Sequence, residues 1–186
     1  MNLDKSLSPE RVQAAEGIRQ VALEAIRCVS NFVPSHADDK DAQFWMQSEL
    51  INRLLWMVTE GKKNWKYSVR YRSRKAVEAA MRGEEISIHH EHVVPRKWLC
   101  KAIMDHPESS IEIASLAVAC VVAVDEHKKL SEIEDGFGWE RYMAAGIEVV
   151  DAASVDFPAS LDLVPLEDLA KKQAERLRRI GLSGGE

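Results

Sequence analysis

The sequence has little of what marks secreted and membrane proteins. Its three cysteines are odd in number and widely spaced, and no C-x-x-C pair occurs, which argues against a disulfide framework and a cysteine zinc site. No segment approaches the roughly 18 consecutive apolar residues of a membrane span. The first ten residues, MNLDKSLSPE, lack the basic and apolar regions of a signal peptide. We therefore expect a cytoplasmic, reduced protein without a membrane partner.

An excess of positive charge is also absent, since the formal net charge is −5, whereas dedicated nucleic-acid-binding domains are more often basic. The 186 residues, of which 46% are apolar and 30% charged, are ordinary for a globular protein and contain no repeat. We expect a single domain over residues 1–180. It would comprise a helical part (1–85), a mixed part (86–135) and a second helical part (136–180), followed by a flexible tail (181–186).

The positive charge that exists is concentrated in one stretch. Residues 61–75, GKKNWKYSVRYRSRK, contain seven Lys and Arg residues and no acid. Interleaved aromatic residues suit this stretch to phosphate contacts and base stacking. The residues that we expect to bind nucleic acid are Lys66, Arg70, Arg72, Arg74 and Lys75. The alternative is a connector whose aromatic rings pack inward while the Lys and Arg stems lie along the surface.

Apolar residues at helical spacing predict two long helices, over 9–31 and 40–60. A short helix should follow Ser73, which is a suitable N-cap, and a last helix should begin at Pro165. The two N-terminal helices either belong to the core or form the interface of a homodimer.

The middle of the chain has a different pattern. The β-branched residues of 86–94 predict a strand that Pro95 ends. The apolar run 116–124, LAVACVVAV, predicts a second, buried strand, and Asp125 is expected to cap a helix that follows it. The sequence thus predicts an α+β fold that is predominantly helical, with a strand–strand–helix unit over about 86–135.

The first of these strands is unusually rich in histidine. IHHEHVVPRKW, residues 88–98, holds three of the six histidines of the chain, with a glutamate between two of them. Imidazole and carboxylate groups together can bind a metal ion or abstract a proton near neutral pH. Glu91 offers an oxygen ligand and His92 a base. His127, at the start of the predicted helix, could reach the same point.

These residues resemble the HNH, or His-Me finger, endonuclease superfamily. HEHVVP, followed by a strand and then DEHKKL, is similar to the strand–strand–helix metal core (ββα-metal) of that family. The resemblance implies that Glu91 and His127 bind a metal ion and that His92 is the general base. It also implies a metal-dependent endonuclease that acts on nucleic acid, DNA in the first place. One Mg²⁺ or Mn²⁺ ion would suit the mixed ligands, with Zn²⁺ or Ni²⁺ as alternatives.

The sequence departs from the family at two positions. No asparagine lies between His92 and His127, where the family has a central one, and Ser131 stands where many members have a further ligand. His90 is an additional candidate for the site.

Two other interpretations therefore stay open. One is a non-catalytic nucleic-acid-binding protein with a degenerate core, and the other is a helical interaction module. In these, Glu91 would pair with Arg96 or Lys97, and His92 and His127 would be exposed residues at the ends of their elements.

Overall fold

Helices make up most of the chain, which confirms the predicted α+β, predominantly helical class. The computed structural model describes residues 9–32, 40–60, 69–133, 136–154, 157 and 159–183. The helices are α1 (Pro9–Ser30), α2 (Lys40–Glu60), α3 (Arg74–Met81), α4 (Arg96–Asp105), the short 3₁₀ helix η1 (Pro107–Ser109), α5 (Ser110–Ala114), α6 (Val124–Glu132), α7 (Trp139–Ala144) and α8 (Leu166–Arg179). The strands are β1 (Tyr71–Ser73), β2 (Ile88–His92), β3 (Ala119–Ala123) and β4 (Val149–Asp151).

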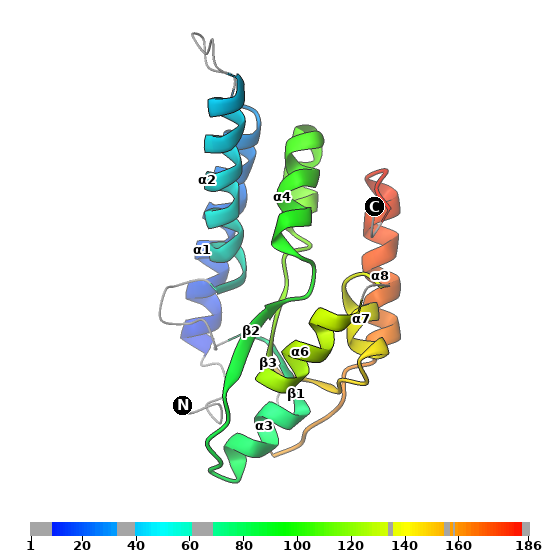
Figure 1. Cartoon of the computed structure of the whole chain (residues 1–186). Helices are drawn as coiled ribbons and strands as arrows, with labels where there is room; N and C mark the ends of the chain where they lie inside the picture. Colours follow the sequence, from blue (N-terminus) through cyan, green and yellow to red (C-terminus); the bar gives the residue numbers. More distant parts are fainter. Residues whose placement is uncertain are drawn as a thin grey trace.

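Helices α1 and α2 lie side by side as a long hairpin, as their apolar spacing predicts (Figure 1). Their inner faces, which include Ile26 and Leu55, are buried against α4 and α5. Gln47, a buried polar residue, donates through Nε2 to the carbonyl oxygens of Val29 (2.9 Å) and Phe32 (2.8 Å). These bonds satisfy carbonyl groups at the C-terminal end of α1, which the helix itself leaves without donors.

The four strands form one mixed sheet in the order β2-β3-β1-β4. Strands β1 and β3 are parallel, whereas β2 pairs antiparallel with β3 and β4 antiparallel with β1. All five residues of β3 are buried, because both faces of this central strand are covered. Strand β3 begins only at Ala119, so the first residues of the predicted strand 116–124 precede it.

Each face of the sheet has its own cover. Helix α3 packs on one face, where Ala76 meets Val121. Helices α6, α7 and α8 pack on the other face, where Cys120 and Val122 meet Leu130 and Tyr142. Neighbouring residues on a strand point to opposite faces, so the register decides which environment each side chain of β2 enters.

Strand β2 is connected to β3 by α4, η1 and α5. The Val94 and Leu99 side chains of this connection are buried together with the α1 and α2 hairpin. Pro95 stands immediately before α4, where its missing N–H costs nothing. The strand–strand–helix unit is therefore present, but a helical insertion separates its two strands.

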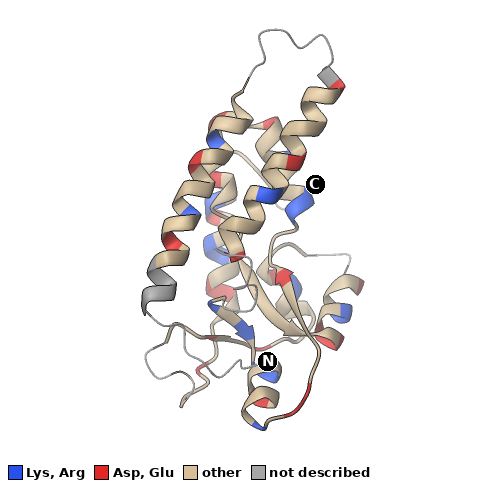
Figure 2. Ribbon diagram, turned by 90° about the vertical axis from the view of Figure 1, so that its left-hand side faces the viewer, with Lys and Arg blue, Asp and Glu red and all other residues tan. Residues whose placement is uncertain are grey.

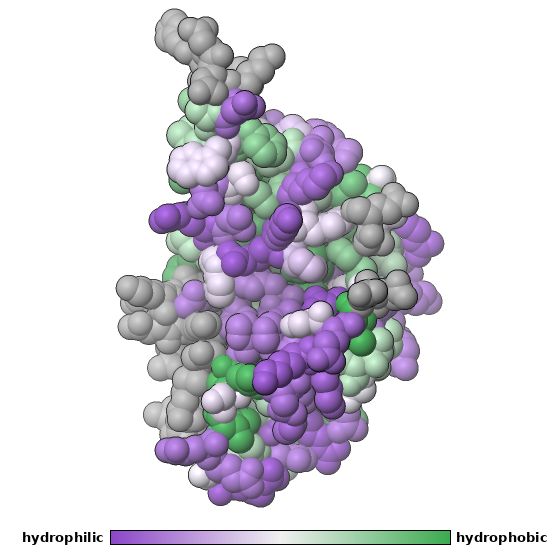
Figure 3. Space-filling model, in the orientation of Figure 1, coloured by the Kyte–Doolittle hydropathy of each residue, from purple (hydrophilic) through white to green (hydrophobic). Residues whose placement is uncertain are grey.

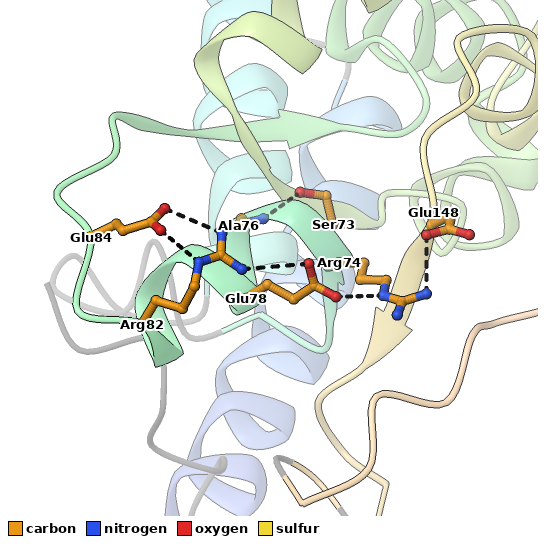
Figure 4. A network of polar contacts seen from close by, with 7 residues as sticks. All are labelled: Ser73, Arg74, Ala76, Glu78, Arg82, Glu84 and Glu148. Atoms are coloured by element: carbon orange, nitrogen blue, oxygen red, sulfur yellow. Dashed lines mark hydrogen bonds and ion pairs between the residues drawn. The ribbon is translucent and has the colours of Figure 1, made fainter.

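Helices α3 and α6 begin directly where the parallel strands β1 and β3 end. Ser73 caps α3 by accepting from the Ala76 N–H (3.2 Å), as predicted (Figure 4). Its hydroxyl also donates to Glu126 Oε2 at 2.5 Å. Glu126 in turn accepts from the Ala123 N–H (2.9 Å) at the start of α6. Asp125 is therefore not the N-cap of α6. It lies within the first turn and pairs with Lys75 on the surface.

The last helix begins after Pro165 and is followed by Gly181 at φ 75°, in agreement with the sequence pattern. Leu182, which belongs to the predicted tail, packs against the core beside Leu177. Residues 184–186 lie outside the described part. No helix among the described residues has the length and hydropathy needed to cross a membrane.

Candidate metal centre

The register of β2 divides its histidines between the two faces of the sheet. His89 lies opposite Val122 and Glu91 opposite Cys120, whereas His90 lies opposite Val121. His89 and Glu91 consequently face α6 and α7. His90 and His92 face the opposite way, because successive side chains alternate along a strand.

His127 completes a cluster with His89 and Glu91. Its Nδ1 lies 2.8 Å from Glu91 Oε2, and its ring stacks on the His89 ring at 3.9 Å between centroids with an interplanar angle of 17°. One ligand atom from each of the three residues lies within 4.8 Å of the other two. The three side chains, called the His–Glu–His cluster below, come from two segments that are far apart in the sequence.

The start of α6 places His127. No loop separates β3 from α6, and the Ser73–Glu126–Ala123 hydrogen bonds fix the first turn of the helix against the sheet. His127 is the fourth residue of α6 and reaches over β2. The Glu91 side chain is only 12% exposed, and that of His127 is 33% exposed, so the cluster opens to solvent on the imidazole side.

Arg141 of α7 approaches Glu91 from the other side. Its Nη2 lies 3.6 Å from Glu91 Oε1 and donates to the Leu130 carbonyl oxygen at 3.0 Å. The Arg141 side chain is 13% exposed. Since both partners are largely buried, this pair is screened by water much less than a surface ion pair. Glu91 thus shares its charge between an imidazole and a guanidinium.

Beneath Glu91 the site is apolar and uncharged. Tyr142 and Cys120 are fully buried there, and burial raises the pKa of the Tyr142 hydroxyl and of the Cys120 thiol well above their ordinary values. Both groups therefore stay protonated at neutral pH. The nearest acidic side chain besides Glu91 is the buried Glu126, which is engaged by Ser73 and the Ala123 N–H.

The donor set fits a divalent cation. Two imidazole nitrogens and one carboxylate oxygen form a common combination for a transition metal that keeps open positions. Ligand atoms around such an ion lie roughly 3–4 Å apart, so small side-chain movements would bring these atoms into range. The ion would replace the hydrogen bond between His127 and Glu91 with two metal–ligand bonds.

His92 does not join this cluster, contrary to the expectation that residues 91, 92 and 127 converge. Its Nε2 lies 3.2 Å from Thr59 Oγ1, and its ring packs edge-on against Trp56 at 4.7 Å. Burial lowers the pKa of His92 to about 3. The imidazole is consequently neutral and enclosed by α2. The strand pattern itself explains this outcome, because adjacent residues of a strand cannot face one site.

His90 is also on the far face and is not placed to serve as the additional ligand. It is 2% exposed and stacks on Trp56 at 5.1 Å between ring centroids. The Arg96 guanidinium lies 4.4 Å from the centre of the Trp56 ring. Trp56, which carries no sequence motif, therefore organises the two histidines of this face.

The described part of the basic stretch is largely neutralised by acidic neighbours. Arg70 forms a bidentate pair with Asp151, and this hydrogen bonding raises the pKa of Arg70. Arg74 pairs with Glu78 and Glu148 (Figure 4). Basic and acidic positions are interspersed over the helices in the same way (Figure 2).

The other three residues that were expected to bind nucleic acid have different environments. Lys75 pairs with Asp125 at 2.5 Å. Arg72 is 2% exposed, with its guanidinium carbon 5.3 Å from the centre of the Phe157 ring. The prediction that Arg72 contacts nucleic acid is therefore wrong for this fold, because alternation turns it inward from β1. Lys66 lies outside the described residues.

Two residues of the site were not selected from the sequence. His89 lies two residues before Glu91 on the same strand, so the two side chains face the same side of the sheet. This i, i+2 spacing could have identified His89 from the sequence. Arg141 belongs to a different helix, and no motif marks it.

Comparisons with known proteins add no relative, since no family model, curated protein or solved structure matches the chain. The resemblance to HNH endonucleases consequently rests on the residues alone.

Proposed function

We propose that the protein is a metal-dependent endonuclease that hydrolyses phosphodiester bonds in nucleic acid. The observation that carries the proposal is the convergence of His89, Glu91 and His127 on a strand–strand–helix unit. DNA is the substrate that the resemblance to HNH endonucleases favours.

The types of ligand atom in the cluster indicate which metal ion it would prefer. Two imidazoles and a single carboxylate favour Mn²⁺, Zn²⁺ or Ni²⁺ over Mg²⁺, which prefers oxygen ligands and retains its water. Among the metals that the sequence suggests, we therefore propose Mn²⁺ as the first candidate and Zn²⁺ as the second. A bound ion of this kind would polarise a phosphodiester and make a water molecule more acidic.

Glu91 and Arg141 would position the metal ion and the phosphate group. Glu91 would hold the metal through Oε2 while its other oxygen stays close to Arg141, which keeps the carboxylate in one orientation. Arg141 would also balance part of the negative charge of a phosphate group brought to the cluster. His92 receives no base role in this proposal, because it is buried against Trp56 and Thr59.

Helix α8 supplies a surface for the nucleic acid. Five of its exposed residues are cations, and none of them forms an ion pair with another residue in the part of the chain that the structure describes. They are Lys171, Lys172, Arg176, Arg178 and Arg179. Unpaired surface cations bind phosphates at lower cost than cations that must first leave a carboxylate. We therefore assign nucleic-acid contacts to α8 before Arg70 or Arg74.

A second candidate function is nucleic-acid binding without cleavage. The observation in its favour is the ion pair between Glu91 and Arg141, which gives the carboxylate a cationic partner without any metal, while His127 hydrogen-bonds to its other oxygen. The missing central asparagine of the family points the same way. In this case the His–Glu–His cluster would be a structural link between β2, α6 and α7.

Metal titration and cleavage assays on one set of variants distinguish the two. The proposal predicts Mn²⁺- or Zn²⁺-dependent cleavage of supercoiled plasmid that His89→Ala and His127→Ala each reduce by about 100-fold or more. High metal concentration should partly restore both variants. His106→Ala is the matched control, because its imidazole is exposed and lies outside the cluster.

Wild-type protein that binds DNA in a salt-sensitive manner but neither binds metal nor cleaves would establish the second function instead. The same assay with a single-stranded RNA decides the class of nucleic acid.

A further inference from the structure

The α1 and α2 hairpin has a second apolar surface that its own chain does not bury. On α2, Met46, Leu50 and Met57 are each 42% exposed, and the exposed Arg53 lies between them. These four positions are separated by four, three and four residues. This alternation of three and four is the spacing of a helix seam that packs on another helix.

Helix α1 carries a matching stripe. Val21 is 67% exposed and Phe32, just after the helix, is 52% exposed, with Ala25 and the exposed Cys28 between them. Their separations are four, three and four residues, as in the α2 stripe. Each stripe lies to one side of the buried face of its helix.

The two stripes border one groove. Its volume is about 280 Å³, and it is lined by Cys28, Val29, Phe32, Met46, Gln47 and Leu50. The hydrogen bonds from Gln47 to the Val29 and Phe32 carbonyl groups hold its floor in place. The hairpin stands at the edge of the molecule in Figure 1, and Figure 3 shows apolar side chains at its upper end. We call the surface formed by the two stripes and the groove between them the hairpin face.

We propose that the hairpin face packs against the same face of a second copy of the chain, so that the two hairpins form a four-helix bundle. A hairpin with seam spacing on both helices needs two further helices to cover it, and a second hairpin supplies them. A two-fold axis makes one patch serve both partners. The exposed apolar residues of this face then become buried together.

The charges on α2 favour a second copy over an unrelated helix. Arg53 is exposed within the seam and Glu49 is exposed next to it, and neither forms an ion pair with any described residue of its own chain. If the two α2 helices cross antiparallel with the axis between Leu50 and Arg53, Glu49 of each copy lies beside Arg53 of the other. The contact thus contains two identical opposite-charge pairs, and the arginine within the apolar seam fixes the register.

The dimer is independent of the His–Glu–His cluster, which lies on the sheet, so its test does not depend on metal or nuclease activity. Sedimentation equilibrium of the full chain should give about twice the chain mass of 21.0 kDa. Leu50→Glu should weaken the dimer by about 100-fold or more, since it places a charge in the centre of an apolar contact. The matched controls are Met81→Glu and Leu163→Glu, which change residues that are 52% and 46% exposed outside the hairpin.

A charge exchange keeps the test decisive if Leu50→Glu alters the fold. Glu49→Arg and Arg53→Glu should each weaken association, and the double variant should restore it. Cys28, the exposed one of the three cysteines, should react with a maleimide more slowly as protein concentration rises. A monomeric wild-type protein at about 100 μM, where a micromolar interface would be largely formed, would overturn the proposal. So would a dimer that Leu50→Glu leaves intact.

Discussion

The substitution Glu91→Gln tests two consequences of the site separately. It removes the charge that lies 2.8 Å from His127 Nδ1 and 3.6 Å from Arg141 Nη2, at a side chain that is 12% exposed. Hydrogen bonds to charged groups contribute about 1.5–3 kcal/mol. Without metal, the variant should therefore lose a free energy of unfolding in this range. For a chain of this size, that corresponds to a decrease of about 3–12 °C in melting temperature.

Adding metal should widen the difference in melting temperature between wild type and Glu91→Gln. An ion present at about 100 times its dissociation constant stabilises the folded state by about 2.7 kcal/mol, which raises the melting temperature by about 5–11 °C. Wild-type protein should show this increase with Mn²⁺ or Zn²⁺. Glu91→Gln should show little of it, because the variant has lost the anionic ligand of the cluster.

Differential scanning calorimetry, with and without metal, measures both quantities on the same samples. The control is Glu148→Gln, which removes a carboxylate of a largely exposed pair with Arg74 and should cost at most about 1 kcal/mol. A metal-induced increase that is equal in wild type and Glu91→Gln would refute the assignment of Glu91 as a ligand. Equal stability of the two proteins without metal would refute the role of Glu91 as an ionic link.

Three further substitutions test the packing that surrounds the site. His92→Ala should destabilise the fold by about 2–4 kcal/mol, because it opens a cavity beside Trp56 and removes the Thr59 hydrogen bond. A loss of metal affinity in this variant would contradict the placement of His92 outside the metal site. In urea titrations, Arg72→Ala should cost about 3–5 kcal/mol, since this arginine is buried, whereas Arg74→Ala should cost about 1 kcal/mol or less; equal losses would contradict the inward orientation of Arg72. Ser73→Ala should cost about 1–3 kcal/mol through loss of the α3 cap and of the bond to Glu126, and an unchanged midpoint would contradict that link.

The long elements were predictable because their signals are local. The spacing of apolar residues placed α1 and α2 within one residue of their observed ends, and Ser73 was correctly identified as the α3 cap. The apolar run at 116–124 placed β3 but not its start, because an equally apolar segment can complete the preceding helix and turn.

The candidate site was only partly predictable. Glu91 and His127 could be paired because one precedes a break in a strand and the other begins the next helix. His92 was expected beside them from its position next to Glu91 and from the resemblance to HNH endonucleases, but strand alternation sends it to the other face. His89 followed from the same rule once the register was known. Arg141, Trp56 and Thr59 come from elements whose positions depend on tertiary packing, so no spacing in the sequence could have indicated them.

X-ray absorption spectroscopy of the zinc-loaded protein tests the central claim most directly, because it reports the ligands of the bound ion itself. The account predicts one ion per chain with two imidazole nitrogens at about 2.0–2.1 Å and the remaining positions filled by oxygen. Both imidazoles should be lost in a protein that carries His89→Ala and His127→Ala together, and retained in His92→Ala. A spectrum without imidazole scattering, or one with sulfur ligands, would contradict a metal centre formed by His89, Glu91 and His127.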